Sequence, residues 1–330
     1  MQRGVSYWVM APLRWLARMA DVPLRAWQRL TGQGGMIALF LLPNMAIFTV
    51  FVLVPLVMNA LYSTTGGVEF FLADRPYIGS DHYQRLLDCG SYLDPLSCRD
   101  DMFWTAVWNT ARFVIFQVGS IILVAMITAL ILNRAIPAKA FWRAVFFFPV
   151  LLSPVVVGLI WKWILQRQGL ANLGMVELGL EPVNWLTERF WAFVAAVGVS
   201  VWAHMGFYTL ILLAGLQAIP RDLYEAAEMD GTPPFRVFYR ITLPLLMPNL
   251  LVVLVLALIR AVQIFDEAYV LTGGGPGTST MFITQYIYEV GFANLLRNPG
   301  LAAAASILMA GVLVVLTLIQ LWLSQRAGKR

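Results

Sequence analysis

Long apolar runs are the feature that most constrains this chain. A helix needs roughly 20 consecutive, mainly apolar residues to cross the hydrocarbon core of a bilayer. We identify six such runs, at residues 36–61, 113–132, 144–165, 190–216, 245–265 and 301–323. Because unpaired backbone groups are costly in lipid, each run is predicted to be a helix. The sequence therefore predicts an all-α integral membrane protein with six transmembrane helices.

Composition supports a chain whose solvent is the lipid bilayer. Of its 330 residues, 60% are hydrophobic and 12% are charged, whereas a soluble domain has about 25% charged residues. The net charge of +5 comes largely from arginines at the ends of apolar runs. Since these arginines do not form one basic patch, we expect no nucleic-acid partner.

The distribution of Lys and Arg predicts the orientation. The N-terminal extension, residues 1–35, contains five arginines and one aspartate. Residues 134–143 and the tail, residues 326–330, each contain three basic residues and no acid. We place these segments and both termini in the cytoplasm of a bacterium, beneath its inner (plasma) membrane. Residues 63–105 contain seven acids against three arginines, and we expect them to form a periplasmic loop.

Two segments leave alternatives open. The extension contains Trp8, Trp15 and Trp27 among arginines, which favours an amphipathic helix on the inner membrane surface over a disordered basic tail. Cys89 and Cys98 lie in the predicted periplasmic loop. They are either disulfide-bonded, as an oxidising compartment favours, or two free thiols. Without a second cysteine pair they do not predict a zinc site, and we expect no metal.

Residues 220–244, between the fourth and fifth runs, predict a cytoplasmic helix–turn–helix. Pro220 suits the first turn of a helix over residues 221–230. Gly231 is placed to end that helix in the left-handed conformation. Thr232 is predicted to cap a second helix with Pro233 in its first turn, and Pro244 to begin the fifth membrane helix.

The same segment carries a recognisable spacing, made by Glu225-Ala226-Ala227, Gly231, Ile241 and Leu243-Pro244. It resembles the EAA signature of permease subunits of ATP-binding-cassette importers. The flanking residues 213–220 and 265–276 resemble the sugar permeases of the maltose and glycerol-3-phosphate type, and the likeness covers residues 36–325. The family more often has Gly-Ala and an aromatic residue where this chain has Thr232-Pro233-Pro234.

The resemblance implies a six-helix permease domain over residues 36–325 that imports a sugar or sugar-like solute by alternating access. Residues 220–244 would include a coupling helix seated on a separate ATPase, with Glu225 paired to a basic residue there. The implied partners are a second homologous permease, two ATPase subunits that bind ATP and Mg²⁺, and an extracytoplasmic solute-binding protein. The chain lacks a Gly-Lys-Ser/Thr phosphate loop, so we expect a transporter subunit that binds no cofactor and is not an enzyme.

Polar side chains in the apolar runs are candidates for a solute path. Gln263, Asp266 and Tyr269 are predicted to share one helix face at the end of the fifth run. Alternatively, Asp266 pairs with Arg260 or Arg112, or caps the helix. We expect His204 to be a packed neutral residue, and Asn109 and Gln117 to make interhelical hydrogen bonds.

An ion-coupled secondary transporter of small polar solutes is the main alternative. It would need buried carboxylates on several helices, whereas nearly all acids of this chain lie in the connections. An intramembrane enzyme would need a catalytic pair at membrane depth, and a channel would have no use for the Glu-Ala-Ala segment.

Overall fold

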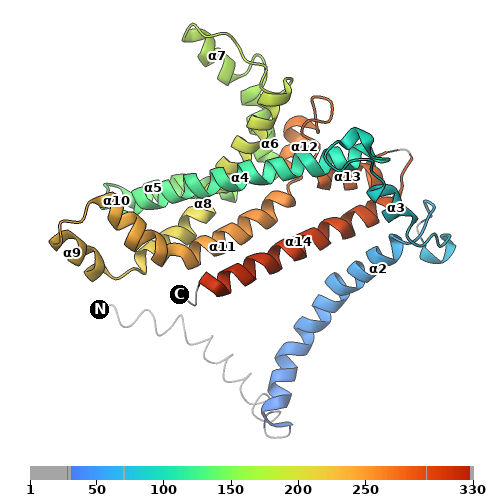
Figure 1. The fold of residues 1–330 in the computed structure, drawn as a ribbon, viewed down its shortest axis with the longest axis horizontal. Coiled ribbons are helices and arrows are strands. Elements are labelled where there is room, and N and C mark those ends of the chain that lie inside the picture. The colour runs from blue at the N-terminus through green and yellow to red at the C-terminus, as the bar shows by residue number, and fades with distance from the viewer. Residues whose placement is uncertain (1–27, 29–30, 70, 295, 328–330) are drawn as a thin grey trace, which may run out of the picture. The chain divides into compact units, whose positions relative to one another are not determined.

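The structure is a computed structural model that describes residues 28, 31–69, 71–294 and 296–327 (Figure 1). Five helices in these ranges are long and apolar enough to cross a membrane: Thr31–Tyr62, Asp101–Asn133, Arg189–Gln217, Pro234–Val262 and Pro299–Trp322. A sixth candidate is a bent pair, Lys139–Leu151 and Pro154–Glu177. The predicted all-α membrane fold is confirmed. The predicted surface helix of the N-terminal extension lies outside the described residues.

The chain divides into two units, Met1–Leu61 and Tyr62–Arg330, and each is described by itself. In the first unit, a π-helical segment, η1 (Thr49–Leu53), precedes α2 (Val54–Tyr62). Pro55 lacks the N–H that an α-helix needs and its ring crowds the preceding turn. The wider turn of η1, just before Pro55, accommodates this proline without ending the helix.

The second unit is built around four long helices, α4 (Asp101–Asn133), α8 (Arg189–Gln217), α11 (Leu243–Val262) and α14 (Pro299–Ala327). Helix α4 packs on α8 and α11, and α14 packs on α11 (Figure 1). Their contact surfaces are rich in small buried residues, including Ala125, Ala129, Ala196 and Ala257. Small side chains let helix backbones approach closely, which is how helices associate in lipid.

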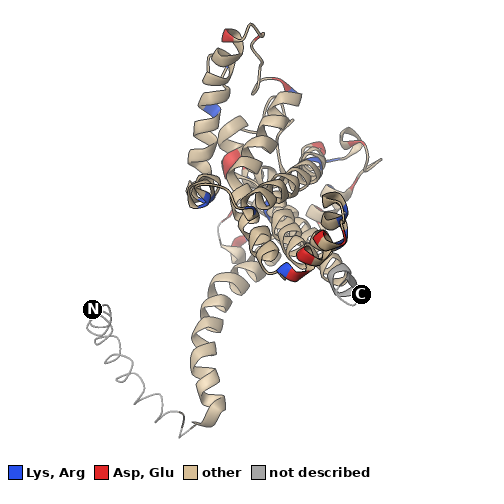
Figure 2. Cartoon of the chain, turned by 90° about the vertical axis from the view of Figure 1, so that its left-hand side faces the viewer, with Lys and Arg blue, Asp and Glu red and all other residues tan. Residues whose placement is uncertain are grey.

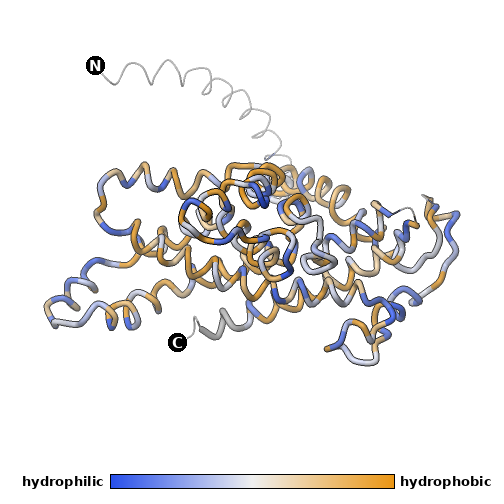
Figure 3. The backbone as a smooth tube through the Cα atoms, turned by 90° about the horizontal axis from the view of Figure 1, so that it is seen from above, coloured by the Kyte–Doolittle hydropathy of each residue, from blue (hydrophilic) through white to orange (hydrophobic). Residues whose placement is uncertain are grey.

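The long helices are mainly apolar. Figure 3 shows the long helices mainly in hydrophobic colours, and Figure 2 shows few charged residues along them. Charged groups nonetheless occur within the described helices, among them Arg112 on α4 and Arg260 on α11. Because charges at membrane depth are costly, both are candidates for a functional role.

The third apolar run does not form one helix. It is divided between α5 (Lys139–Phe147), the 3₁₀ turn η4 (Phe148–Leu151) and α6 (Pro154–Leu165), and α7 (Leu170–Glu177) follows. The two halves are bent by 101°. The prediction of a single helix over 144–165 is therefore wrong, because Pro149 and Pro154 remove two backbone donors where the helix would have to continue. Helix α8 approaches this break closely, since a Cβ on Gly206 would collide with the Phe146 carbonyl oxygen.

The chain breaks again after α11. Three short helical segments follow: α12 (Asp266–Thr272), α13 (Ile283–Tyr288) and the π-helical η6 (Glu289–Ala293). Side chains from other segments satisfy the carbonyls exposed here. The Thr284 hydroxyl donates to the Ile264 carbonyl, and the Asn109 amide donates to the carbonyls of Thr278 at 2.7 Å and Met281 at 3.2 Å. Asn109 thus bonds a distant segment, but its acceptors lie in the connection between α12 and α13, so the expected interhelical hydrogen bonds are not observed. Gln117 is fully buried, but its amide has no partner among the described residues.

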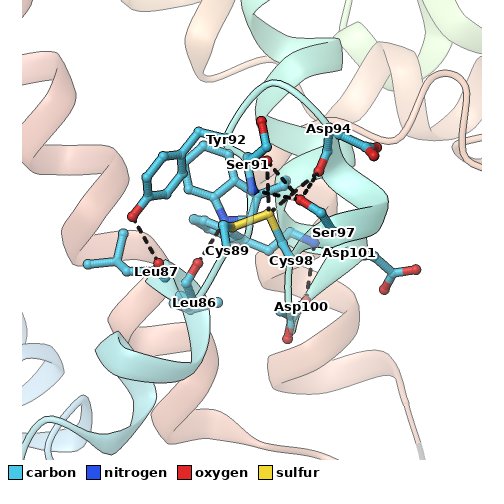
Figure 4. Close-up of a disulfide and its surroundings, with 12 residues drawn as sticks. Leu86, Leu87, Cys89, Ser91, Tyr92, Asp94, Ser97, Cys98, Asp100 and Asp101 are labelled. Carbon is cyan, nitrogen blue, oxygen red and sulfur yellow. Dashed lines mark hydrogen bonds between the residues drawn. A yellow bond between two sulfur atoms is a disulfide. The ribbon is translucent and has the colours of Figure 1, made fainter.

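The segment before α4 is a compact loop with three short helical pieces, η2 (Leu72–Asp74), α3 (Asp81–Leu87) and η3 (Pro95–Ser97). A disulfide joins Cys89 to Cys98 (Figure 4). Arg85 pairs with Asp100 at 3.2 Å, and the Asp100 carboxylate accepts a hydrogen bond from the Phe103 N–H, capping α4. These contacts fix the loop to the end of the bundle.

We expect the Cys89–Cys98 bond to form in the native membrane. Neither thiol should react with a maleimide before reduction, and both should react afterwards. A Cys98→Ser variant should expose one thiol, at Cys89, and should lose about 2 kcal/mol of stability with the cross-link. Alkylation followed by mass spectrometry measures each site, and two freely reactive thiols in the unreduced membrane would contradict the bond.

Candidate functional site

The helix–turn–helix predicted over residues 220–244 is present. Helix α9 (Arg221–Met229) follows Pro220, and α10 (Pro234–Val237) follows a tight turn. Figure 1 shows both at one end of the bundle, with α3 and α13 at the other. We call residues 220–244 the coupling segment.

Gly231 makes the turn in the coupling segment, with φ +61°, a conformation that glycine adopts without steric cost. The Thr232 N–H donates to the Ala227 carbonyl at 2.9 Å, and the Gly231 N–H donates to the Glu228 carbonyl at 3.0 Å. These bonds close α9. The prediction that Thr232 caps the second helix is wrong, because the residue at the N-cap position is Pro233, which has no side-chain acceptor. Helix α10 begins at Pro234 after Pro233, without a side-chain cap.

The surface of α9 combines a free carboxylate with exposed apolar groups. Glu225 and Ala226 are exposed, whereas Ala227 is buried. Glu225 has no ion pair or side-chain hydrogen bond within the described ranges. Met229 is 89% exposed and Phe235 76%. Large exposed apolar groups beside an unpaired charge are typical of a protein-docking surface.

The coupling segment is mechanically tied to a membrane helix. Helix α10, the π-helical η5 (Phe238–Thr242) and α11 follow one another without a break and form the single span Pro234–Val262. Ile241 lies in η5, and Leu243 and Pro244 lie at the start of α11. The prediction that the fifth helix begins at Pro244 is therefore wrong. The Tyr224 and Thr242 hydroxyls hydrogen-bond at 3.1 Å, so α9 is also fastened to this helix by its side chains.

The predicted solute-path residues do not share one helix. Helix α11 ends at Val262, and Asp266 begins α12, so the helical spacing assumed for Gln263, Asp266 and Tyr269 is wrong. All three side chains are nonetheless exposed in the structure. The ring of Tyr269 stacks on Phe265 at 5.2 Å and meets Tyr288 edge-on at 5.7 Å. Tyr269 thus belongs to an aromatic surface that also includes Phe292.

A polar cluster bridges the break between α11 and α12. Arg260 pairs with Glu267 at 4.0 Å and donates to His204 Nε2 at 3.3 Å. Glu267 is 3% exposed. Asp266 pairs with neither Arg260 nor Arg112. Arg260 instead forms its ion pair with the adjacent Glu267. His204 Nδ1 lies 2.9 Å from the Ser200 carbonyl oxygen, so His204 is held within its own helix, as expected of a packed residue.

Sequence reasoning missed one cavity, which lies between α4 and α8 and has a volume of about 920 Å³. Its wall includes Trp108 and Arg112 from α4 and Arg189 from α8. The residues are far apart in the sequence, so only the packing of the two helices brings them together. Only the spacing of Trp108 and Arg112 by four residues, which places both on one face of a helix, pointed to this cavity in the sequence.

A family model described as "Binding-protein-dependent transport system inner membrane component" matches residues 121–329. The chain belongs to this family of inner membrane transport components. It is a permease subunit of an ATP-binding-cassette importer, as the EAA-like spacing implied. This permease is a transporter subunit rather than an enzyme, and its relatives give the ion-coupled alternative no support.

Several relatives cover nearly the whole permease. The trehalose/maltose transport system permease protein MalF of Thermococcus litoralis is 36% identical over 284 residues, covering 86% of this chain and 91% of that protein. The sulfoquinovosyl glycerol transport system permease protein SmoG of Agrobacterium fabrum is 33% identical, with 94% and 97% covered. A chain of a bacterial ABC transporter that imports the acidic polysaccharide alginate matches with a TM-score of 0.75 and 25% identity, covering 92% of this chain and 99% of that one.

We expect Arg260 and Glu267 to depend on each other for stability. Glu267→Ala leaves the Arg260 charge unpaired beside a buried site, and should lower the free energy of unfolding by about 2 kcal/mol, somewhat less than for a fully buried pair. Combining Arg260→Met with Glu267→Ala should cost less than the sum of these two single changes. Thermal unfolding of the purified protein in detergent measures each variant, and strictly additive effects would contradict the pairing.

Proposed function

We propose that this permease imports a saccharide or saccharide-like solute across the inner (plasma) membrane. Transport would proceed by alternating access, powered by two separate ATPase subunits that hydrolyse Mg²⁺-bound ATP. The observation that carries the proposal is the exposed α9 surface, with an unpaired Glu225 carboxylate, on a segment continuous with a membrane helix. A docking surface so placed transmits force from a partner to the membrane.

In this proposal α9 seats in a groove of one ATPase. Glu225 pairs with a basic side chain of the ATPase, Ala226 permits close approach, and the Gly231 turn sets the angle between α9 and α10. When the ATPases close on ATP, α9 moves with them. The Tyr224–Thr242 bond and the unbroken helix from Pro234 to Val262 carry this movement into the membrane.

The proposed assembly also contains a second homologous permease and an extracytoplasmic solute-binding protein. Exposed apolar side chains on α6 and α7, among them Trp163 and Leu173, offer a surface for the second permease or for lipid. The alginate importer, whose fold this chain shares, is known in complex with an alginate pentasaccharide-bound periplasmic protein. The acid-rich loop before α4 is the surface we assign to the binding protein here.

The proposed orientation places both termini and the coupling segment in the cytoplasm. Basic residues flank the membrane helices on that side, whereas the loop with the cysteines is acidic. In this orientation, the loop that contains Cys89 and Cys98 faces the oxidising side of the membrane.

The solute class rests on the relatives and on the aromatic surface near α12. Relatives of this chain are named as transport permeases for trehalose and maltose, for sulfoquinovosyl glycerol, for lactose and for arabinooligosaccharides. An exposed aromatic ring such as Tyr269 offers a flat apolar face to a sugar ring, while Gln263 and Asp266 offer polar groups nearby. We assign these three residues to the solute path.

Reversal of charge at the coupling helix tests the function. Glu225→Lys should abolish uptake and solute-stimulated ATP hydrolysis, because a lysine would repel the basic partner assigned to the ATPase. Membrane insertion should be unchanged, since Glu225 is exposed. Uptake into proteoliposomes and ATP hydrolysis of the complete transporter measure the effect.

Glu181→Lys is the matched control. It makes the same charge change at an exposed residue in the connection between α7 and α8, and should leave uptake and hydrolysis within about twofold of the unmodified protein. Normal uptake by the Glu225→Lys variant would discredit the coupling role of α9.

A further inference from the structure

The cavity between α4 and α8 has the dimensions of a small-molecule site. Its volume of about 920 Å³ lies within the usual range of about 300–1,000 Å³. Trp108, Arg112 and Phe116 line it from one face of α4, and Arg189 and Phe193 line it from α8. All five residues lie in the halves of their helices next to the disulfide loop, because α4 and α8 both begin at that end.

The cavity carries positive charge without an internal counter-charge. Arg112 and Arg189 are both exposed, and neither makes an ion pair or a side-chain hydrogen bond within the described ranges. None of the described residues that line the cavity is acidic. Two guanidinium groups in one concave site favour a carboxylate, sulfonate or phosphate, with which arginine forms paired hydrogen bonds.

Neutral polar groups complete the wall. Ser279 lines the cavity with other atoms, since its hydroxyl is buried. Asn109 holds this part of the chain by donating to the Thr278 carbonyl. Thr105 and Ser120 contribute further hydroxyls. An acyl chain would leave such groups without partners, which is unfavourable, whereas a polyhydroxylated ligand satisfies them.

Aromatic rings form the remaining surface and are held rigidly. Trp108 donates its indole N–H to the Tyr92 carbonyl at 2.9 Å. Phe193 meets Phe116 edge-on at 5.9 Å, and Trp202 meets Trp161 at 5.4 Å. Fixed aromatic faces beside a few polar groups are typical of sites that bind small organic molecules.

We propose that this cavity binds an anionic saccharide, a sugar that carries a carboxylate or sulfonate group. Arg112 and Arg189 hold the anionic group, Trp108 and Phe193 contact the apolar faces of the sugar rings, and the hydroxyls of Thr105 and Ser120 bond the polar groups of the ligand. The inference rests on the proposed import of saccharides and narrows the solute to an acidic one.

A cysteine reporter tests the proposal directly. A Cβ on Gly198 would have no neighbour within 4 Å, and Gly198 lines the cavity, so Gly198→Cys introduces a thiol without displacing anything. In the complete transporter, reconstituted in phosphatidylcholine discs, the rate of its reaction with N-ethylmaleimide is measured by mass spectrometry of this chain. The probes are trigalacturonate and the neutral trisaccharide made by reducing its carboxyl groups.

Trigalacturonate should protect the reporter at about a tenfold lower concentration than its neutral counterpart, since a cleft of one charge concentrates counter-ions by about 10-fold or more. Arg112→Gln with Arg189→Gln should remove this preference, and the corresponding lysine variants should retain part of it. Arg297→Gln is the matched control, because Arg297 is exposed and does not line the cavity; it should keep the full preference.

Equal protection by the two trisaccharides, no protection by trigalacturonate, or a preference that survives loss of both arginines would overturn the proposal. A parallel series with phosphatidylglycerol in the discs distinguishes a lipid headgroup as the ligand. Protection that requires this lipid and ignores trigalacturonate would assign the cavity to lipid. None of these results would change the expected effect of Glu225→Lys on ATP hydrolysis. A failure of the cavity proposal can therefore be distinguished from a failure of the proposed function.

Discussion

Backbone hydrogen bonding in a medium without water is the constraint on which the rest of this structure depends. Long helices satisfy it within themselves, and a break is tolerated only where other groups pair with the freed carbonyls. The break after α11 meets this condition through Thr284, which donates to Ile264, and Asn109, which donates to Thr278 and Met281. Lys162 likewise donates to the Val270 carbonyl, near the end of α12, at 3.1 Å. The polar residues inside the bundle therefore fix its irregular parts.

The breaks between helices determine which side chains the permease exposes at each end of the bundle. The break after α11 separates a rigid helix from the short helix α12, which presents Asp266 and Tyr269. The Arg260–Glu267 pair holds the two together at 4.0 Å. At the opposite end, the helix that leaves the coupling segment has no break between Pro234 and Val262. A continuous helix from the coupling segment to a jointed region is suited to converting displacement of α9 into rearrangement deeper in the membrane.

The sequence predicted the features that depend on local pattern. Hydrophobic length located the membrane helices, and the glycine and proline positions located α9 and the Gly231 turn. It failed where tertiary contacts outweigh pattern. The apolar run at 144–165 hides a 101° bend, and the α11 break falls in a sequence without proline, at Gln263–Phe265. The α4–α8 cavity was missed because Arg112 and Arg189 meet only through helix packing.

The proposed coupling requires that α9 faces the cytoplasm and contacts an ATPase made from another polypeptide. The most direct measurement is photocrosslinking from position 229, where the side chain is 89% exposed, in whole cells that make the complete transporter. We expect a photoreactive residue there to crosslink to the ATPase subunit, with a yield that changes when ATP is bound. Crosslinks to the extracytoplasmic binding protein, or labelling of a cysteine at that position by a membrane-impermeant reagent in intact cells, would contradict the claim.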